Sequence, residues 1–494
     1  MNKIKIGWGE ASIVPDGKKV DLIGQFYERI SDVVETPIAI NSLAIECGDD
    51  CVIFCSCDLV SVSHSLLEDV RAALPESFPK DKLIISAIHT HTSLGYEKCE
   101  DEFLDGLFGL NAFLPEKYIY KPLVSDNSAD VLRGAGARKF LIERISVAAL
   151  SAWENRKEGF YSCGFGRAAV GMCRRVCYDD GSAKMWGDTN SANFTELETG
   201  NDSGIELLFT YNENKKLTGV VANIACPSQV LEHQSFISSD YMGKVKALIR
   251  EKYGEDVGFL GLVSPAGDIC PRDMIRWVDS PVTKNDPNIF REKVLDRRAD
   301  PSMFDIKGAN LAAKRVANEI FWALEDVTEY VSETELVHRK LDVDLPIRRV
   351  TPEEYENAYK ALTDFAKSCT GSITYEDNAR MQIHCGTVAR YRLQQTQDIF
   401  TIESHVLKLG DVAFATNPFE LFLNYGNQIR ARSLAKQTFL IQLACGSWGY
   451  LPTEKAEKGG HYSAFVSSGT AGHVGGEMLV RKTLNEINSL FEEK

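Results

Sequence analysis

Two histidines separated by one residue follow a short apolar segment in the first fifth of the chain. The stretch KLIISAIHTHTS runs from a predicted buried strand over 82–89 into His89 and His91. Side chains two positions apart on an extended strand share a face, so both imidazoles are expected to address one spot beyond the carboxyl end of this strand. Ligands bind at such ends in open α/β sheets, and paired imidazoles suit zinc. The motif alone is equally typical of two hydrogen-bonded histidines.

Two further predicted strands are followed by side chains that could bind a metal or react. Strand 217–225 is followed by Cys226, whose thiolate is a good zinc ligand, although a cysteine at such a place is more often an inert buried thiol. His233 is an alternative ligand in the same segment. Strand 257–264 breaks into PAGDICP, a tight turn that Gly267 permits and that displays Asp268 or Cys270 at its tip. For this segment by itself, a simple strand-terminating turn is the favoured explanation.

The carboxyl-terminal segments supply a carboxylate and two phenols. Glu420 follows a predicted strand over 411–416 and falls in the opening turn of a predicted helix over 418–435, where acidic residues are favoured without any catalytic role. Tyr450 and Tyr462 flank a loop that contains two adjacent glycines and a histidine. Taken singly, each of these segments is weak evidence for a reaction.

The elements that must position these residues alternate between strand and helix. Short β-branched apolar runs predict additional buried strands over 51–58 and 438–444. Amphipathic periodicity predicts the clearer of the other helices over 64–74, 137–156, 243–253, 308–325 and 352–368. This alternation predicts α/β layers. Long polar loops at 97–130, 176–203 and 276–303 are expected to contribute to a functional site. Longer alternating stretches of sequence begin near 330, which predicts a subdomain boundary there.

Composition narrows the class of protein. Lys and Arg number 55 against 70 Asp and Glu, a net charge of −15 that repels nucleic acid and anionic lipid alike. With 44% apolar and 25% charged residues, the chain is expected to fold as an ordinary globular protein. We find neither a signal peptide nor an apolar run long enough to span a bilayer, which predicts a cytoplasmic location. The 13 cysteines form no CxxC pairs and are expected to be mostly reduced core thiols, such as Cys51, Cys55 and Cys57.

Taken together and in order, the sequence blocks resemble the neutral/alkaline, non-lysosomal ceramidase family. The resemblance runs from about residue 4 to 480, and its specificity lies in the number and order of the blocks. They are IGWGEASIVPDG, FYERIS with SLAIE and SCDL, HTHTS, CPSQVLEHQSFISSDYMG, PAGDICP, NPFE, and GYLPT followed by GGHY.

The resemblance implies a single zinc ion bound by two histidines, a glutamate and a tyrosine. The corresponding residues here are His89, Cys226, Glu420 and Tyr450, with a cysteine at the position of the second histidine. A cysteine ligand keeps the metal but weakens it as a Lewis acid.

The same resemblance implies roles for residues around the metal. His91 corresponds to a proton-transfer group, while Arg174, in GMCRRV, and Tyr462 would polarise the substrate carbonyl. Cys270 replaces a serine in the turn, and Gly267, Asp268 and His233 are assigned to substrate binding.

The implied fold is one large α/β catalytic domain over 1–494, with two β-sheets between helical layers and without the family's additional C-terminal immunoglobulin-like domain. The implied activity is zinc-dependent hydrolysis of an amide in a small or lipid-like N-acyl substrate, in which the metal activates water. One alternative is a hydrolase of an ester or glycoconjugate that uses Cys270 as a thiolate nucleophile. Another is a non-catalytic protein that binds a metal or small ligand. Homo-oligomerisation is left open.

Overall fold

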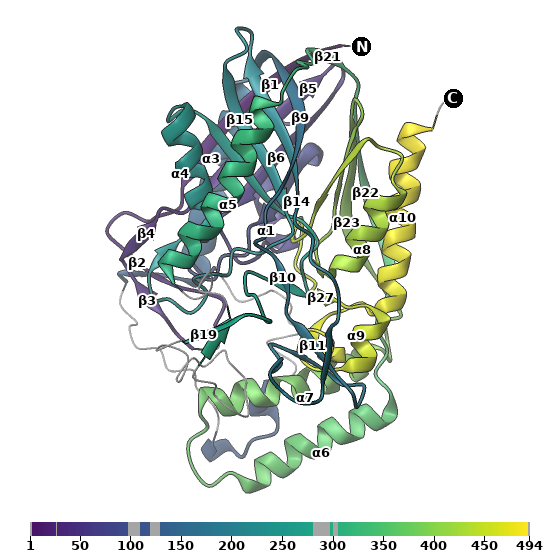
Figure 1. Ribbon diagram of the computed structural model, residues 1–494. Helices are drawn as coiled ribbons and strands as arrows, with labels where there is room; N and C mark the ends of the chain where they lie inside the picture. Colours follow the sequence, from purple (N-terminus) through teal and green to yellow (C-terminus); the bar gives the residue numbers. More distant parts are fainter. Residues whose placement is uncertain are drawn as a thin grey trace.

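Two β-sheets lie face to face in the middle of the molecule, with helices on both outer sides (Figure 1). The computed structural model describes residues 2–25, 27–96, 109–118, 129–279, 297–299 and 305–492. The predicted α/β fold with an α-β-β-α arrangement is therefore confirmed. Most of the loops predicted at 97–130 and 276–303 lies outside the described residues.

The larger sheet is built from the first two thirds of the chain. Its strand order is β17-β15-β14-β9-β1-β5-β6-β7, with β21 paired to β1. Pairing is antiparallel except for β6 with β7 and β15 with β17. The strands are β1 (Asn2–Ser12), β5 (Ala39–Cys47), β6 (Asp50–Cys57), β7 (Leu83–Ala87), β9 (Lys157–Arg167), β14 (Gly204–Asn212), β15 (Leu217–Ile224), β17 (Gly258–Val263) and β21 (Glu333–Thr334).

The smaller sheet begins immediately after β21. Its order is β22-β23-β24-β26, formed by β22 (Leu336–Pro346), β23 (Ile399–Leu409), β24 (Val412–Thr416) and β26 (Gln437–Ile441). The first three strands are antiparallel, and β24 runs parallel to β26. The chain passes from one sheet to the other close to residue 330, while the predicted subdomain boundary there stays a prediction.

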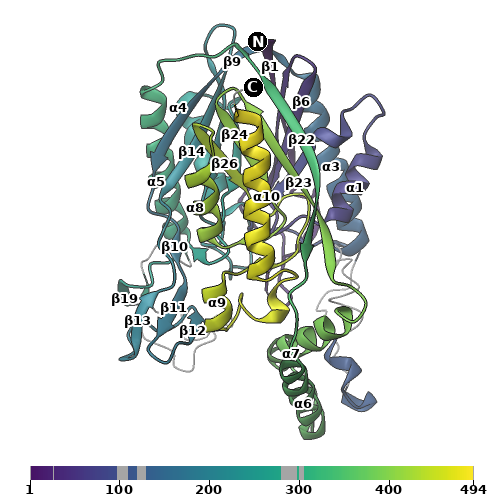
Figure 2. The same ribbon diagram turned by 90° about the vertical axis from the view of Figure 1, so that its right-hand side faces the viewer.

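Helices cover the outer face of each sheet. Those over the larger sheet are α1 (His64–Ala73), α3 (Gly134–Glu154), α4 (Asp240–Tyr253) and α5 (Ile306–Glu325). Over the smaller sheet lie α8 (Leu423–Arg432) and α10 (His473–Phe491), as Figure 2 shows. A helical hairpin, α6 (Pro352–Ser368) and α7 (Tyr375–Leu393), projects at the lower end of both views.

Aromatic side chains fill the space between the sheets. The ring of Phe54 on β6 lies 5.4 Å from that of Phe414 on β24, and Phe414 stacks on Phe439 of β26 at 4.5 Å. All three belong to one buried apolar cluster that crosses from sheet to sheet. Cys51, Cys55 and Cys57 lie in this cluster as free thiols, as the sequence predicts.

The predicted strands and helices agree with the structure except after β24. The loop predicted at 176–203 instead contains three short paired strands, β11 (Arg175–Tyr178), β12 (Ala183–Met185) and β13 (Phe194–Leu197). Pro418 was expected in the first turn of a helix over 418–435, but α8 begins only at Leu423. The intervening residues form a two-residue strand, β25 (Glu420–Leu421), which pairs with β27 (Tyr450–Leu451). Pairing with a distant segment has overridden the local preference for a helix start.

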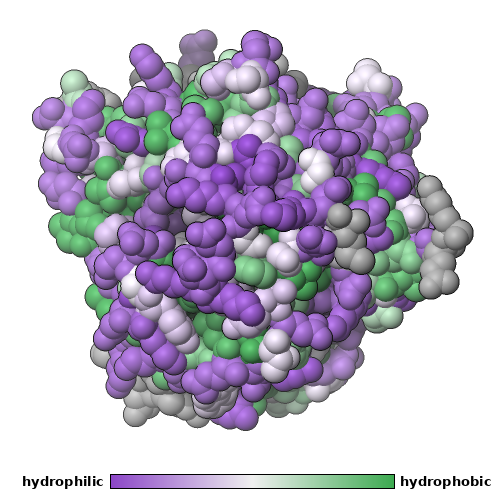
Figure 3. Space-filling view, turned by 90° about the horizontal axis from the view of Figure 1, so that it is seen from above, coloured by the Kyte–Doolittle hydropathy of each residue, from purple (hydrophilic) through white to green (hydrophobic). Residues whose placement is uncertain are grey.

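The upper face of the molecule, in the orientation of Figure 1, is mainly polar. Hydrophilic side chains cover most of that face, and apolar side chains occur there in separate groups (Figure 3). Among the described helices, none combines the length and the apolar character needed to cross a bilayer.

Candidate active site

Five segments that follow strands bring the predicted site residues to one end of the two sheets. His89 follows β7, Cys226 follows β15, Gly267 follows β17, Glu420 follows β24, and Tyr450 follows β26. These five strands all take part in parallel pairs, so their carboxyl ends point the same way within each pair. The carboxyl end of parallel strands is where α/β sheets bind ligands.

His89 is held in an unusual backbone conformation. Strand β7 ends at Ala87, and His89 has a φ of 68°, in the left-handed region that a residue other than glycine rarely adopts. The expectation of an extended HxH pair is therefore wrong. The conformation is stabilised by the His89 amide, which donates to Leu59 O at 2.9 Å, and by its Nδ1, which lies 2.7 Å from Val60 O.

His91 nevertheless faces His89. The two Nε2 atoms are 3.3 Å apart, and the rings meet edge to face with centroids separated by 4.8 Å. His91 Nδ1 lies 3.0 Å from Gly24 O, and the Arg29 guanidinium donates to His91 O at 2.6 Å. Burial, together with the neighbouring His89, lowers the pKa of His91 well below its usual range. His91 is therefore a neutral imidazole in this arrangement.

Glu420 and Tyr450 are aligned by the short β25–β27 pair, in which they are direct partners. The Glu420 amide donates to Gly449 O at 3.0 Å, which fixes the register. Glu420 Oε2 then lies 3.6 Å from His89 Nε2. Glu420 is thus placed by strand pairing and not, as the sequence predicts, by a helix N-terminus.

Arg174 connects the phenols to the turn after β17. Its Nη2 donates to Gly267 O at 3.0 Å and reaches the Tyr450 hydroxyl at 3.4 Å. The Tyr450 hydroxyl in turn lies 3.2 Å from that of Tyr462, a residue that is 41% exposed. Burial alone would lower the pKa of Arg174, but Tyr450, Cys270 and Glu420 raise it, so the guanidinium stays charged.

Gln229 is a site residue that we did not predict. Its amide nitrogen lies 3.1 Å from His91 Nε2, and its amide oxygen lies 3.5 Å from Arg174 Nη1. The residue belongs to the CPSQVLEH block, which is the one feature of the sequence that could have drawn attention to it. The partners of a buried amide depend on the fold and not on local pattern.

The PAGDICP turn packs directly on β25. The Gly267 amide donates to Leu421 O at 2.9 Å, and an added Cβ on Gly267 would lie 2.3 Å from Glu420 O. Asp268 Oδ1 accepts from the amide of Leu423, the first residue of α8, at 2.8 Å. Burial raises the pKa of Asp268 to about 6. In this structure, both residues brace the segment that carries Glu420.

We expect Gly267→Ala to displace Glu420, because the new methyl group would overlap the backbone of β25. Forcing a methyl group into a packed site typically costs about 1–3 kcal/mol. The variant should lose that much unfolding free energy in chemical denaturation, and it should bind less of the zinc that the sequence predicts at this site. Gly371→Ala is the matched control, since nothing lies within 4 Å of its added Cβ. Full metal content in Gly267→Ala would contradict the proposed bracing.

Cys226 and His233, which were also predicted for the site, contact groups other than His89 and Glu420. The Cys226 thiol lies 3.6 Å from Val170 O and 3.6 Å from Pro227 O. It does not form, with His89 and Glu420, a group of ligand atoms within 4.8 Å of one another among the described residues. His233 Nε2 lies 3.2 Å from the amide nitrogen of Gln234, its chain neighbour. The predicted roles of Cys226 as a metal ligand and His233 in substrate binding stay predictions.

Cys270 is fully buried next to Arg174. Its Sγ lies 3.8 Å from Arg272 O, and its backbone pairs with Met172 in the two-stranded β10 (Met172–Cys173) and β18 (Ile269–Cys270) ribbon. Burial raises the pKa of Cys270 to about 12. A thiolate nucleophile needs a lowered pKa and access, and this thiol has neither.

The donor set around His89 fits a zinc ion. Carbonyl oxygens only accept, so His89 donates through Nδ1 to Val60 O, and a neutral His89 presents a lone pair at Nε2. That lone pair faces the Glu420 carboxylate, which also only accepts, so the pair requires a metal ion or a proton. A ligating histidine whose other nitrogen donates to a carbonyl is a common second-sphere pattern. His89, Glu420 and Tyr450 therefore fit the nitrogen and oxygen ligands of zinc.

Comparison with solved structures gives a close architectural match. The crystal structure of neutral ceramidase from Pseudomonas aeruginosa aligns with a TM-score of 0.64 at 14% identity, covering 99% of this chain and 75% of that one. The chain has a neutral ceramidase-like fold. A ceramidase complexed with C2 aligns with the same TM-score and coverage at 13% identity. No protein-family model and no curated protein matches the sequence. The likeness confirms the resemblance predicted from the order of the motifs at the level of the fold.

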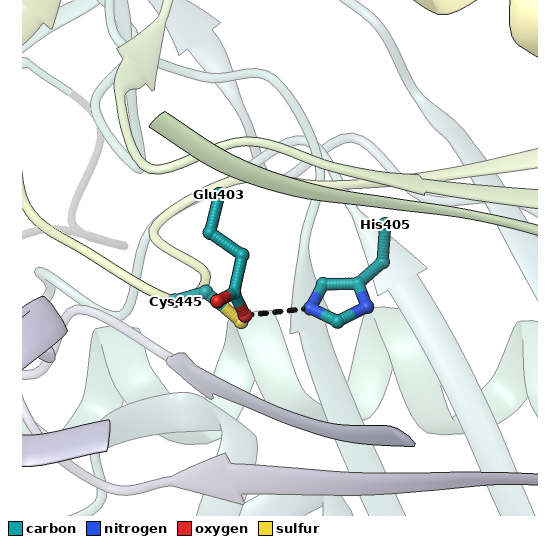
Figure 4. Close-up of side chains that lie close together, drawn as sticks. All are labelled: Glu403, His405 and Cys445. Atoms are coloured by element: carbon teal, nitrogen blue, oxygen red, sulfur yellow. Dashed lines mark hydrogen bonds and ion pairs between the residues drawn. The ribbon is translucent and has the colours of Figure 1, made fainter. Parts of the chain in front are cut away.

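The structure contains a second cluster of possible metal ligands, which does not include His89. Glu403, His405 and Cys445 are buried, with ligand atoms within 4.8 Å of one another (Figure 4). Glu403 also groups in this way with His64 and Glu68 of α1.

A cation from the protein already occupies this second cluster. The Arg71 guanidinium donates to both carboxylate oxygens of Glu403, at 2.6 and 2.8 Å, and also to Glu68 at 2.8 Å. His405 Nε2 lies 2.8 Å from Glu403, and its Nδ1 lies 2.8 Å from His338 Nε2. The cluster is therefore accounted for as a buried hydrogen-bond network that joins α1 to the smaller sheet.

Proposed function

We propose that this protein is a zinc-dependent hydrolase that cleaves the amide bond of a small or lipid-like N-acyl substrate. The observation that supports it best is the convergence of His89, Glu420 and Tyr450, drawn from three distant segments, beside Arg174 and Tyr462. The neutral ceramidase-like fold supports the same conclusion, together with the contacts that join three of the four predicted ligands, His89, Glu420 and Tyr450.

His89, Glu420 and Tyr450 would hold the ion. When bound, zinc supplies Lewis acidity, which polarises a carbonyl and makes water nucleophilic near neutral pH. The protein supplies the rest of the chemistry. The buried, charged Arg174 and the Tyr462 hydroxyl lie where they can donate to an oxygen that gains negative charge. Although the ring of Tyr462 is partly exposed, desolvation of its hydroxyl and the nearby Glu420 carboxylate raise its pKa, so this phenol keeps the proton that it donates.

His91 is the group placed to move a proton. It is neutral, its Nδ1 donates to Gly24 O, and its Nε2 lies beside His89, where its lone pair accepts from the Gln229 amide. A neutral imidazole can accept a proton from the attacking nucleophile at Nε2 and pass it to the nitrogen of the departing amine.

Removal of the metal provides the direct test. The purified protein should contain about one zinc ion per chain by mass spectrometry, and a panel of N-acyl amides of increasing chain length should identify a substrate. Treatment with a strong chelator should lower amide hydrolysis by at least about 10²-fold, since a Lewis acid contributes several kcal/mol. Added zinc should restore the activity.

The outcomes separate the alternatives. Activity that survives chelation but is lost on alkylation of Cys270 would overturn the proposal in favour of thiol chemistry. Zinc bound at full occupancy, with no turnover of amides, esters or glycosides, would overturn it in favour of a binding protein. Turnover of esters alone would retain the metal-dependent hydrolase and exclude the amide specificity.

A further inference from the structure

Gln229 lies between the two groups that are proposed to handle charge in the site. It is 3% exposed and sits in the segment that follows β15. This segment is bonded to the segment that carries His89 and His91, because the Ser228 amide donates to Ile88 O at 3.1 Å. The side chain of Gln229 then reaches His91 on one side and Arg174 on the other.

Elementary hydrogen-bond rules fix how the amide of Gln229 is oriented. Arg174 can only donate, so it must face the amide oxygen of Gln229, at a distance of 3.5 Å. The amide NH₂ group therefore faces His91 Nε2, at 3.1 Å. The opposite orientation would place two donors against each other at Arg174.

The same rules fix the tautomer of His91. An amide NH₂ group can only donate, so Nε2 of His91 must accept. At the other ring nitrogen, Gly24 O can only accept, so Nδ1 must carry the proton. Both neighbours select the same tautomer, with the hydrogen at Nδ1 and a lone pair at Nε2.

We propose that Gln229 is a positioning residue that couples Arg174 to His91 and fixes the tautomer and the ring orientation of His91 beside His89. The catalytic consequence rests on the proposed hydrolase function, whereas the effect on the imidazole does not. Without the Gln229 side chain, the His91 ring keeps its hydrogen bond at Nδ1 but loses the one at Nε2. The ring can then tilt about the remaining hydrogen bond. Proton transfer then has to begin from a less favourable geometry.

A second buried glutamine shows what a purely structural role looks like. Gln442 is 1% exposed, and its side-chain oxygen accepts from the backbone amides of Ala266 and Leu421, each at 3.0 Å. Gln442 touches neither histidine in these hydrogen bonds. Gln229, in contrast, bonds to two side chains of the site. The two residues form a matched pair for experiment, since both lose a buried amide when changed to methionine.

The first measurement is nitrogen-15 NMR of the histidine side chains, in protein labelled at its nine histidines. The His91 signals are assigned by their loss in His91→Ala. In Gln229→Met, the Nε2 signal of His91 should shift, because its hydrogen-bond donor is gone. In Gln442→Met it should stay in place. An unchanged His91 signal in Gln229→Met would overturn the proposal.

The second measurement is kinetic. Loss of a residue that orients a metal-site neighbour typically costs about 10–100-fold, so kcat of Gln229→Met should fall by that factor with zinc content and KM nearly unchanged. In a His91→Ala background, the same substitution should cost less than about twofold, because residues that act as a unit are non-additive. Additive losses in the double variant would assign Gln229 a role independent of His91 and overturn the coupling.

The two measurements separate failure of this inference from failure of the proposed function. If the wild-type protein hydrolyses nothing while the His91 signal still shifts in Gln229→Met, the positioning role stands and the hydrolase proposal fails. If the wild-type protein is active and Gln229→Met has the same kcat, the hydrolase proposal stands and the positioning role fails.

Discussion

His89→Ala is expected to lose its zinc and at least about 10³-fold of its amide hydrolysis, the equivalent of about 4 kcal/mol of transition-state stabilisation. His89 contributes the nitrogen that faces Glu420, and its position is fixed by the hydrogen bond from Nδ1 to Val60 O. Removing the imidazole leaves one carboxylate and one phenol, too few to hold a zinc ion tightly. Metal content and kcat/KM measured on the same preparation check this expectation.

His384→Ala is the matched control for this experiment. His384 lies on α7, in the helical hairpin, and its substitution removes an imidazole without touching the cluster around His89. The control should keep both metal and activity. Full zinc occupancy in His89→Ala, with a circular dichroism spectrum like that of the wild type, would remove His89 from the ligand set.

Arg71→Met is expected to cause a large loss of stability, because Arg71 on α1 forms a buried ion pair with Glu403 of the smaller sheet. The side chains of Arg71 and Glu403 are 7% and 4% exposed, and the guanidinium bonds to both carboxylate oxygens. Removing one partner of such a buried pair typically costs about 3–5 kcal/mol, because the other charge loses its main compensation. Glu403 would keep only His405 at 2.8 Å and the Lys340 ammonium at 3.6 Å. Chemical denaturation at pH 7 should show that loss.

The loss should depend on pH in a defined direction. Burial by itself raises the pKa of Glu403, but hydrogen bonds from Arg71 and His405 outweigh it and hold the pKa below the ordinary value of 4.5. A depressed pKa in the folded state adds stability above the unfolded value, and this contribution disappears as the pH falls through the folded value. In Arg71→Met the effect of burial is no longer opposed by the guanidinium. The deficit should then be greatest at neutral pH and smaller near pH 5.

Two further variants test the origin of the effect. Arg71→Met combined with Glu403→Leu removes both charges and should recover most of the lost stability, since apolar replacements of buried pairs are often neutral. Arg339→Met breaks an ion pair with Glu486 in which the side chains are 40% and 36% exposed, and should cost less than about 1 kcal/mol. A double variant as unstable as Arg71→Met would show that the uncompensated charge is not the cause.

Local sequence pattern was sufficient to predict many of the strands that carry the site. The apolar runs over 51–58, 217–225 and 257–264 became β6, β15 and β17 within one or two residues, because buried strands exclude polar side chains on both faces. The ends of these strands also located the site. Since the carboxyl ends of parallel strands gather at one edge, residues that follow them are neighbours whatever their separation in the chain.

Pairings between distant segments could not be predicted in the same way. Glu420 follows a proline and a strand, which locally favours a helix start, yet the register with Tyr450 determines its conformation. Arg71 and Glu403 are 332 residues apart, and nothing near either residue indicates the other. His89 was expected to be extended, because a left-handed φ at a histidine is selected by tertiary hydrogen bonds and not by sequence.

Because Glu420 is aligned by pairing with Tyr450, it can take its place only after the last part of the chain has been synthesised. The imidazole pair and Arg174 emerge with the larger sheet, whereas the carboxylate waits for the partner strand that fixes its register. During synthesis, His89, His91 and Arg174 are therefore present before the Glu420 carboxylate is in place. Binding of the proposed zinc ion is therefore expected only after the smaller sheet is complete.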